Sequence, residues 1–577
     1  MPRDVWLFVL IVAVIAPFRL VQTAHVRWML VDGGYYTEVA RHVRDGLGLT
    51  THVSLYHMGY ENFPHPTPIY PLWPWILGMS ARVGDLYQLA HWLPLALSFV
   101  ALLAAFLFGR ALAPGDLFRR LPGFHAGHLA ALMLGLQREF VVYTSLPYTE
   151  GIAWSLLFLF AWRLARERGA LRMAGAVEAG VWMGLLYLAR AQLMVVPMAL
   201  AVAYTLRFAL GPDRPRVAAH GAVALGVFGL FLGAWWAHLR AIVPGAGLAA
   251  LLRFDQNRAN DLLAPLDVIV ATDGPLAFLA DRARGVAVAW GLVPGIGYAD
   301  AFHTLHWALP VALPFAGLAL ARALRRDGRA ALLARLAAPS AFPWIFLGVL
   351  AAGALLSVQL AHKQYNGEWY FARRQGLVAL FAFFLSLWWL LARAGRFGRA
   401  LGGLVLVSSL WMGVATLWDQ AKDRRSETRG RDRHGALVAW LRDRADEGGV
   451  VVAMDGHLTQ RVAWRTRDVG YHWFHEETSY ADLLTLTDRL GARYVVLRPG
   501  SLKGKWRFEK QAGDALKRDF RRLSTRPDKH VILERRRDGP SGLGPTPRET
   551  GNAPHLPTES DRSRAVGGHG RADEEAP

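Results

Sequence analysis

The stretch Asp32-Gly33-Gly34-Tyr35-Tyr36 begins about ten residues after the first of many long apolar segments. A carboxylate just beyond a membrane span is costly to place without a function, so an acid in this position is a functional-site hypothesis. We therefore take Asp32 as the first candidate catalytic residue and ask whether the rest of the sequence agrees with it.

The composition indicates a membrane protein. The chain has 577 residues, of which 53% are hydrophobic and 11% aromatic, and it contains no cysteine. Many apolar runs have the length that crosses a hydrocarbon core of about 30 Å. The net charge of +20 comes largely from short arginine clusters between these runs. Membrane topology explains such clusters, so we expect no nucleic-acid partner, and the absence of cysteine excludes disulfides and thiolate chemistry.

The apolar pattern predicts an all-α polytopic membrane protein with about eleven spans. The spans cover about Val5–Val21, Leu89–Leu112, His125–Tyr143, Tyr148–Ala165, Ala174–Ala189, Leu193–Phe208, Val217–Leu239, Thr304–Leu324, Phe342–Ala361, Leu377–Ala392 and Leu401–Trp418. Gln22-Thr23-Ala24 is a poor signal-peptide cleavage site, so we favour a retained first span over a cleaved leader.

The arginines orient these spans. With the N-terminus in the cytoplasm, every predicted inner loop is basic, as the positive-inside rule requires. The outer loops then cover about residues 22–88, 240–303 and 362–374, and everything after about Asp419 is also outside. We expect a multi-pass protein of the bacterial cytoplasmic membrane, in contact with membrane lipids, with an extracytoplasmic active site and C-terminus.

The C-terminal part differs in character from the spans. Val450–Met454 and Tyr494–Leu497 have the pattern of buried strands, and apolar residues at helical spacing flank them. The sequence therefore predicts a transmembrane domain over residues 1–420, a small extracytoplasmic α/β domain over 421–537 and a disordered tail over 538–577.

The first outer loop contains two distinct segments. An amphipathic helix is predicted to lie at the membrane interface and to end at Gly46 and Gly48. Its apolar face is formed by Tyr36, Val39, Ala40, Val43 and Leu47. Simple packing on the membrane bundle explains this helix equally well. The Pro-rich stretch His65–Pro74 predicts a rigid loop that re-enters the membrane surface.

Three motifs carry a family resemblance. The first-loop acid is followed by Tyr70-Pro71-Leu72, the fourth span opens with Leu146-Pro147-Tyr148-Thr149-Glu150, and Gly180–Arg190 is a Gly-containing span that ends in Leu-Ala-Arg. Their order resembles the GT-C-fold glycosyltransferases that use lipid-linked sugars, in particular family 39, which includes protein O-mannosyltransferases and the lipid A aminoarabinose transferase. Many members carry an Asp-Glu pair where this chain has Asp32-Gly33, which weakens the case for a carboxylate-pair or metal-assisted site.

The resemblance implies a transferase with a polyprenyl-phosphate sugar donor and an extracytoplasmic acceptor that is a protein, a lipid or an envelope glycan. Asp32 is the candidate base that takes a proton from the acceptor. The candidate donor-phosphate ligands are Arg190, Arg373, Arg374 and Lys363. The candidate substrate contacts are Tyr35, Tyr36, His65 and Glu150. The alternative for each arginine is that it extends to lipid headgroups.

No cofactor and no metal ligand is predicted. The first loop lacks a dense acid cluster, so a divalent metal is possible but has no support from the sequence. His472, His475 and Glu476 are ligand-type residues at loose spacing, which favours a surface loop over a metal site. A transporter or flippase of lipid-linked saccharides is the main alternative function, and a non-catalytic subunit of a cell-envelope assembly is a third.

Overall fold

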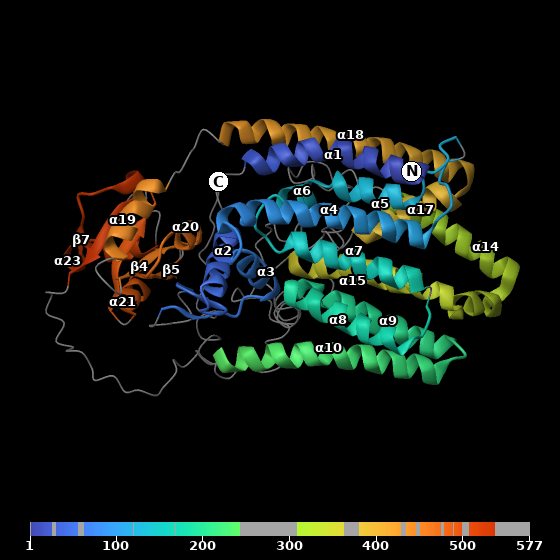
Figure 1. Cartoon of the computed structure of the whole chain (residues 1–577), viewed down its shortest axis with the longest axis horizontal. Helices are drawn as coiled ribbons and strands as arrows, with labels where there is room; N and C mark the ends of the chain where they lie inside the picture. Colours follow the sequence, from blue (N-terminus) through green and yellow to red (C-terminus); the bar gives the residue numbers. More distant parts are fainter. Residues whose placement is uncertain are drawn as a thin grey trace, which may run out of the picture.

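The computed structural model describes residues 2–25, 31–55, 63–118, 120–167, 169–242, 308–362, 380–427, 434–445, 450–474, 478–488, 490–498 and 507–536. These residues form an elongated helical bundle with a mixed β-sheet at one end (Figure 1). We call this end, which carries residues 31–55 and the sheet, the sheet end.

Twelve of the described helices form the bundle. They are α1 (Arg3–His25), α4 (Leu86–Leu112), α5 (Ala126–Gly135), α6 (Arg138–Tyr143), α7 (Glu150–Glu167), α8 (Met173–Ala189), α9 (Val195–Leu210), α10 (Arg214–Ile242), α14 (Ala308–Ala337), α15 (Phe342–His362), α17 (Leu380–Arg393) and α18 (Gly395–Glu427). One continuous cluster of buried Ala, Leu and Phe side chains runs through the bundle. Large apolar side chains such as Trp6 and Trp411 are exposed on α1 and α18. Such exposure is expected of a lipid-facing surface.

The described helices agree in part with the predicted spans. Within the described ranges, α1, α4, α10 and α18 are long and apolar enough to cross a membrane, and a bent pair, 311–337 with 339–353, would be a fifth span. Four shorter apolar helices, α5, α8, α9 and α17, accompany them. The predicted continuous span His125–Tyr143 is wrong, because the chain leaves the helix at Gln137 (ψ 120°) and divides the segment into α5 and α6. The number of about eleven spans stays a prediction.

The predicted basic loops gather at the end of the bundle opposite the sheet, which we call the basic end (Figure 1). Arg110 in the last turn of α4 pairs with Asp4 at 2.9 Å. Arg207 in the last turn of α9 donates to the carbonyl of Gly169 at 2.7 Å, and Gly169 packs against Pro339. Helices α14 and α17 also have arginines in their last turns. Loops that are far apart in sequence thus share one face, as the charge pattern requires.

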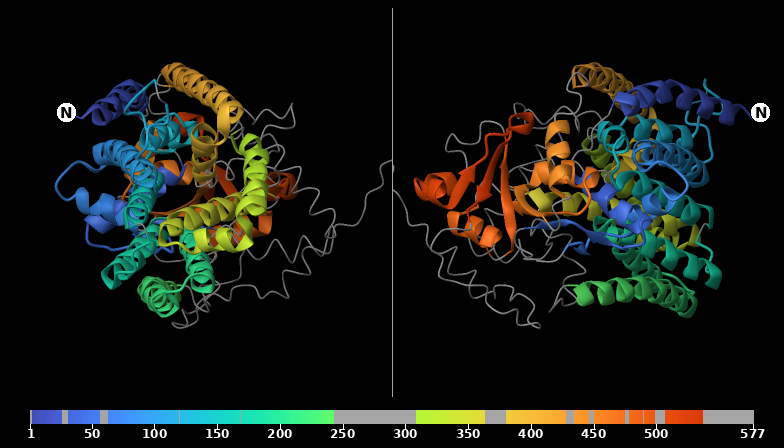
Figure 2. Two further views of the ribbon diagram at one scale, coloured as in Figure 1. Left: turned by 90° about the vertical axis from the view of Figure 1, so that its right-hand side faces the viewer. Right: turned by 60° about the vertical axis from the view of Figure 1, so that its left-hand side comes forward.

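Helix α2 (Val31–Arg44) lies between the bundle and the sheet (Figure 2, right). Two glycines with positive φ, Gly46 (84°) and Gly48 (73°), follow it and turn the chain away, as predicted. Its apolar side packs on α3 (Leu72–Ser80), where a side chain in place of Gly78 would come within 2.8 Å of Val43 Cβ. Thr37, Glu38, Arg41 and His42 of α2 are buried as well. The prediction of a helix lying at the membrane interface did not foresee that the sheet covers this polar side.

The Pro-rich stretch is also more structured than expected. His65 and Pro66 form β3, which pairs antiparallel with β1 (Thr50–Thr51). Helix α3 then begins at Leu72 and includes Pro74 in its first turn, where the missing N–H costs no helical hydrogen bond. The prediction that this stretch is a loop throughout is therefore wrong.

The sheet has six strands in the order β2-β5-β4-β6-β8-β7. They are β2 (Val53–Leu55), β4 (Val450–Asp455), β5 (Val469–Phe474), β6 (Ala492–Leu497), β7 (Phe520–Arg522) and β8 (Val531–Arg535). β2 comes from the first loop and pairs parallel with β5. The sheet therefore extends beyond the predicted 421–537 unit. His472 is buried in β5 rather than exposed on a surface loop.

Short helices flank the strands. They are α19 (Gly435–Ala445), α20 (Gly456–Val462), η8 (Ala463–Arg465), α21 (Tyr480–Asp488), α22 (Arg507–Ala512), α23 (Ala515–Asp519) and η9 (Pro527–Lys529). The segment around η8 contacts both α2 and α4. Arg41 of α2 donates from Nη1 to the carbonyls of Trp464 and Thr466 at 3.1 and 2.5 Å, and the Trp464 ring stacks on Tyr87 of α4.

Arg41 should therefore stabilise the junction between bundle and sheet. Arg41→Met keeps the aliphatic stem and removes two charged hydrogen bonds to backbone carbonyls, so we expect a loss of about 2–4 kcal/mol in unfolding free energy. Arg44→Met is the matched control, because Arg44 makes an exposed pair with Asp45 that contributes about 0–1 kcal/mol. Thermal unfolding in detergent should give a lower midpoint for Arg41→Met than for Arg44→Met. Equal midpoints would contradict the stabilising role of Arg41.

Candidate functional site

The first turn of α2 lies against the loop that precedes α7. A Cβ atom added to Gly33 would be 2.7 Å from Pro147 Cγ and 3.3 Å from Tyr148 Cε1. Trp73 of α3 donates from Nε1 to the Pro147 carbonyl at 2.9 Å, which fixes this loop from a second side. The structure therefore brings the Asp32 motif and the Glu150 motif, which are more than 100 positions apart in sequence, to one place at the sheet end.

The contact at Gly33 explains why this chain has glycine where the Asp-Glu pattern has glutamate. An approach of 2.7 Å leaves no room for a side chain, so only glycine permits the packing. Asp32, one residue earlier, is half-buried and begins the helix, where a carboxylate interacts favourably with the helix dipole. The glutamate found after this aspartate in many family 39 members would collide here. Any second acid must come from elsewhere in the fold.

Glu150 and Arg190 form a buried ion pair. Glu150 begins α7 and its side chain is 1% exposed, whereas Arg190 follows α8 and its side chain is 12% exposed. The backbone at Arg190 is extended (φ −164°, ψ 123°), which ends α8 and turns the guanidinium toward the carboxylate before the short helix η1 (Ala191–Met194). Arg190 Nη1 donates to Glu150 Oε1. The sequence selected both residues but did not predict that they pair.

The two adjacent tyrosines of α2 face different cores. Tyr36 packs on the apolar core of the bundle, and Tyr35 packs on the apolar core of the sheet. The hydroxyl of Tyr35 lies 2.7 Å from Thr67 Oγ1, which ties α2 to the loop after β3. In the same loop the ring of Tyr70 makes an edge contact with Tyr187 of α8, one turn before Arg190. The first-loop motif and the Gly180–Arg190 motif are thus joined by an aromatic contact, and substrate contact by Tyr35 or Tyr36 stays a prediction.

His65 is buried and bonded to the backbone. Its Nε2 is 3.2 Å from the Val53 carbonyl and its Nδ1 is 2.9 Å from the Pro66 carbonyl. Burial lowers the pKa of His65, and a neutral ring can donate to only one of these two carbonyls. These contacts give His65 a structural role between β2 and β3, and its contact with substrate stays a prediction.

Three predicted phosphate ligands, Lys363, Arg373 and Arg374, lie outside the residues that the structure describes.

Sequence reasoning missed another arginine. Arg19 of α1 is fully buried, donates to Thr144 Oγ1 and lies over the Phe140 ring at 4.8 Å. It therefore supports the segment that leads into Pro147. A lone arginine inside the first predicted span was the signal available in the sequence.

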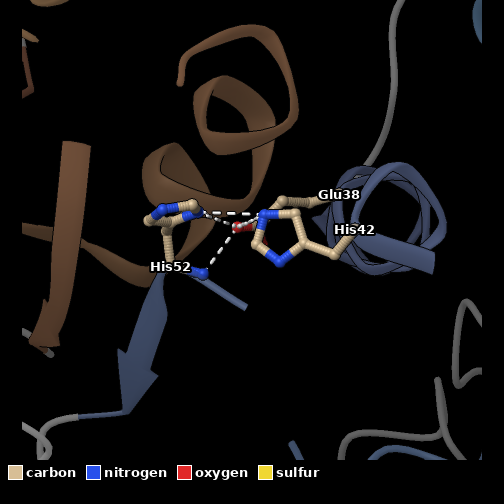
Figure 3. Close-up of side chains that lie close together, drawn as sticks. All are labelled: Glu38, His42 and His52. Atoms are coloured by element: carbon tan, nitrogen blue, oxygen red, sulfur yellow. Dashed lines mark hydrogen bonds and ion pairs between the residues drawn. The ribbon is translucent and has the colours of Figure 1, made fainter. Parts of the chain in front are cut away.

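A second missed group offers ligands for a metal ion. Within the described ranges, Glu38, His42 and His52 are the residues whose ligand atoms converge closely enough to hold one ion (Figure 3). The sequence signal was Glu38 and His42 at positions i and i+4 of the predicted amphipathic helix, which places both on one helical face. The sequence analysis gave this face no role, and all three residues are buried.

No protein-family model and no curated protein sequence matches the chain. Solved structures of the oligosaccharyltransferase AglB from the archaeon Archaeoglobus fulgidus do match. The apo form has a TM-score of 0.56 at 14% identity, over 86% of this chain and 69% of the neighbour. A form tethered to an acceptor peptide has a TM-score of 0.52 at 13% identity, over 84% and 68%.

A third structure of the same protein, in complex with an inhibitory peptide and a dolichol-phosphate, has a TM-score of 0.50 at 14% identity, over 84% of this chain and 69% of the neighbour. Similarity at this level of identity shows the fold. The chain has the GT-C fold of polytopic membrane glycosyltransferases, as its motifs predicted, and membership of family 39 stays a prediction.

Proposed function

We propose that this chain is a membrane glycosyltransferase that moves a sugar from a polyprenyl-phosphate donor to an extracytoplasmic acceptor. One observation carries the proposal: the first turn of α2, with Asp32, packs against the loop that delivers Glu150 to Arg190. An acid and a paired guanidinium thus lie at the same end of a GT-C bundle. The neighbours support this assignment, since one was solved with a dolichol-phosphate and another with a tethered acceptor peptide.

The transfer step requires a base and an anion-binding group. The acceptor oxygen or nitrogen attacks the anomeric carbon of the donor sugar, and the bond from that carbon to the phosphate oxygen breaks. The electron pair of this bond remains on the phosphate, and the proton of the acceptor passes to the carboxylate of Asp32. Asp32 suits this role because it is half-buried and begins a helix that packing holds in place.

Arg190 is the proposed phosphate ligand. Its guanidinium is permanently charged and can donate several hydrogen bonds, and Nη1 donates to Glu150. The buried carboxylate orients the cation before the donor arrives, which lowers the cost of organising the site at the moment of reaction. Lys363, Arg373 and Arg374 are the further candidates for contacts with the same phosphate. Tyr35, Tyr36, His65 and Glu150 are the proposed contacts with substrate, and their packing also supports the shape of the site.

The proposed sidedness follows from the two ends of the bundle. Arginines that end α4, α9, α14 and α17 mark the basic end, which the positive-inside rule assigns to the cytoplasm. The sheet end, with Asp32 and Arg190, then lies outside. A flippase of lipid-linked saccharides is the competing function, and it gives no specific role to an acid fixed beside a buried ion pair.

The first test is chemical. Asp32→Asn should lower the rate of sugar transfer from a labelled polyprenyl-phosphate donor by about 100-fold or more, because the base is lost, while donor binding survives. Asp45→Asn is the matched control, since Asp45 follows the same helix and makes an exposed pair with Arg44. Near-native transfer by a folded Asp32→Asn variant would refute the assignment of the base. Movement of the sugar-lipid across vesicles without transfer would favour the flippase.

The second test concerns Arg190. Arg190→Ala alone would remove the ion-pair partner of the buried Glu150 carboxylate, at a cost of about 3–5 kcal/mol, and is a poor probe. The double variant Glu150→Gln/Arg190→Gln keeps two groups that can hydrogen-bond and removes both charges. We expect it to raise KM for the donor about tenfold or more, because a ground-state phosphate contact is lost. Glu150→Gln alone, which retains the cation, should bind donor more tightly than the double variant. Equal KM values for the native chain and both variants would exclude Arg190 as a phosphate ligand.

A further inference from the structure

Glu38, His42 and His52 form a closed cluster between the bundle and the sheet (Figure 3). Glu38 and His42 are one turn apart on α2, and His52 directly precedes β2. His42 Nε2 lies 3.0 Å from His52 Nδ1, and Glu38 Oε1 lies 3.5 Å from His52 Nδ1 and 3.9 Å from His42 Nε2. Two imidazole nitrogens and one carboxylate oxygen therefore face a common centre.

The size of this triangle matches a metal ion. A triangle with sides of 3.0, 3.5 and 3.9 Å has a circumradius of about 2.0 Å, and Zn–N and Zn–O bonds are about 2.0–2.2 Å long. An ion at or near the centre would be at bonding distance from all three atoms without movement of the backbone. Three protein ligands would leave one position of a tetrahedral zinc ion for water.

A hydrogen bond outside the cluster directs the lone pair of His42 to its centre. His42 Nδ1 is 2.9 Å from Thr50 Oγ1, and this hydroxyl is placed to donate its own proton to the Leu47 carbonyl at 3.3 Å. Thr50 therefore accepts from His42 Nδ1–H, which leaves the lone pair of Nε2 directed inward. A partner that fixes the tautomer from the far side of the ring is the usual support of a metal-bound histidine.

The Glu38 side chain is fully buried and would bring one carboxylate oxygen to the ion. Glu38 also accepts from Thr51 Oγ1 and from the backbone N–H of His52, both at 2.7 Å, which holds the carboxylate in place.

We propose that Glu38, His42 and His52 bind one divalent transition-metal ion, with Zn²⁺ as the best match to two imidazoles and one carboxylate. This donor set disfavours Mg²⁺ and Ca²⁺, which prefer all-oxygen sites. The ion would fasten α2 to the segment that enters β2, where the carbonyl of His52 accepts from Tyr471 N–H of β5 at 2.7 Å. It is a structural site at the junction of bundle and sheet, apart from the transfer step, so it can fail while the proposed function stands.

The test measures metal content and stability, not transfer. The full chain should be purified without a polyhistidine tag, stripped with a chelator and titrated with Zn²⁺ alone. We expect about one equivalent to bind and the unfolding midpoint to rise, reversibly on renewed chelation. Co²⁺ in the same site should give the intense visible absorption of a four-coordinate ion. The variant Glu38→Gln/His42→Gln should lose both signals, whereas His238→Gln, a substitution on α10 far from the cluster, should keep them.

A second variant distinguishes a metal site from a hydrogen-bonded pair of histidines. Thr50→Val removes the group that fixes the His42 tautomer and should weaken Zn²⁺ affinity by about 10–100-fold. If the stripped native chain unfolds at the same temperature with and without Zn²⁺ and binds no saturable equivalent, the proposal is overturned. A proton on His52 Nδ1, shared with His42 Nε2, would then join the two rings. This outcome is read on the native chain and does not depend on the folding of any variant.

Discussion

The arrangement of the site depends on the packing of the first turn of α2 against Pro147 and Tyr148. Gly33 permits this approach because a side chain at that position would collide with the proline ring. Asp32 is thereby held beside the loop that starts α7, and the same helix continues between two apolar cores, with Tyr36 in one and Tyr35 against the other. A single short helix thus positions the candidate base and also joins the membrane bundle to the sheet.

Each buried charged side chain at this junction has specific partners. Glu150 is matched by Arg190, Glu38 by two histidines and two hydrogen-bond donors, and Arg41 by two backbone carbonyls. An isolated buried charge would cost several kcal/mol. The partners therefore keep each side chain charged and hold the helices and strands that carry them in a fixed geometry. This favours a rigid site, in which the groups that hold a donor phosphate are oriented before the donor binds.

The sequence predicted the motifs and their shared face better than their contacts. Apolar runs and basic loops were sufficient for the GT-C fold and for the choice of Asp32, Glu150 and Arg190, because these signals are local. The Glu150–Arg190 pair, the entry of β2 into the C-terminal sheet and the Glu38–His42–His52 cluster depend on long-range packing. Helical periodicity shows that one face of α2 is polar but not what covers that face. The need for glycine at position 33 could be recognised only in the structure, where Gly33 packs against Pro147.

The most direct test of this account is a disulfide across the contact at Gly33. The chain has no cysteine, so Gly33→Cys/Pro147→Cys introduces the only two thiols. Pro147→Cys removes the proline ring that excludes a side chain at position 33. The Cβ atom at position 33 would then lie 2.7 Å from the former position of Pro147 Cγ, within the short reach of a disulfide. Asp45→Cys/Pro147→Cys, with one cysteine at the other end of α2, is the control. Mass spectrometry of proteolysed protein should find residues 33 and 147 linked and the control pair free. If both thiols at 33 and 147 remain open to alkylation in folded, oxidised protein, Asp32 does not lie beside the Glu150 loop and the proposed site is wrong.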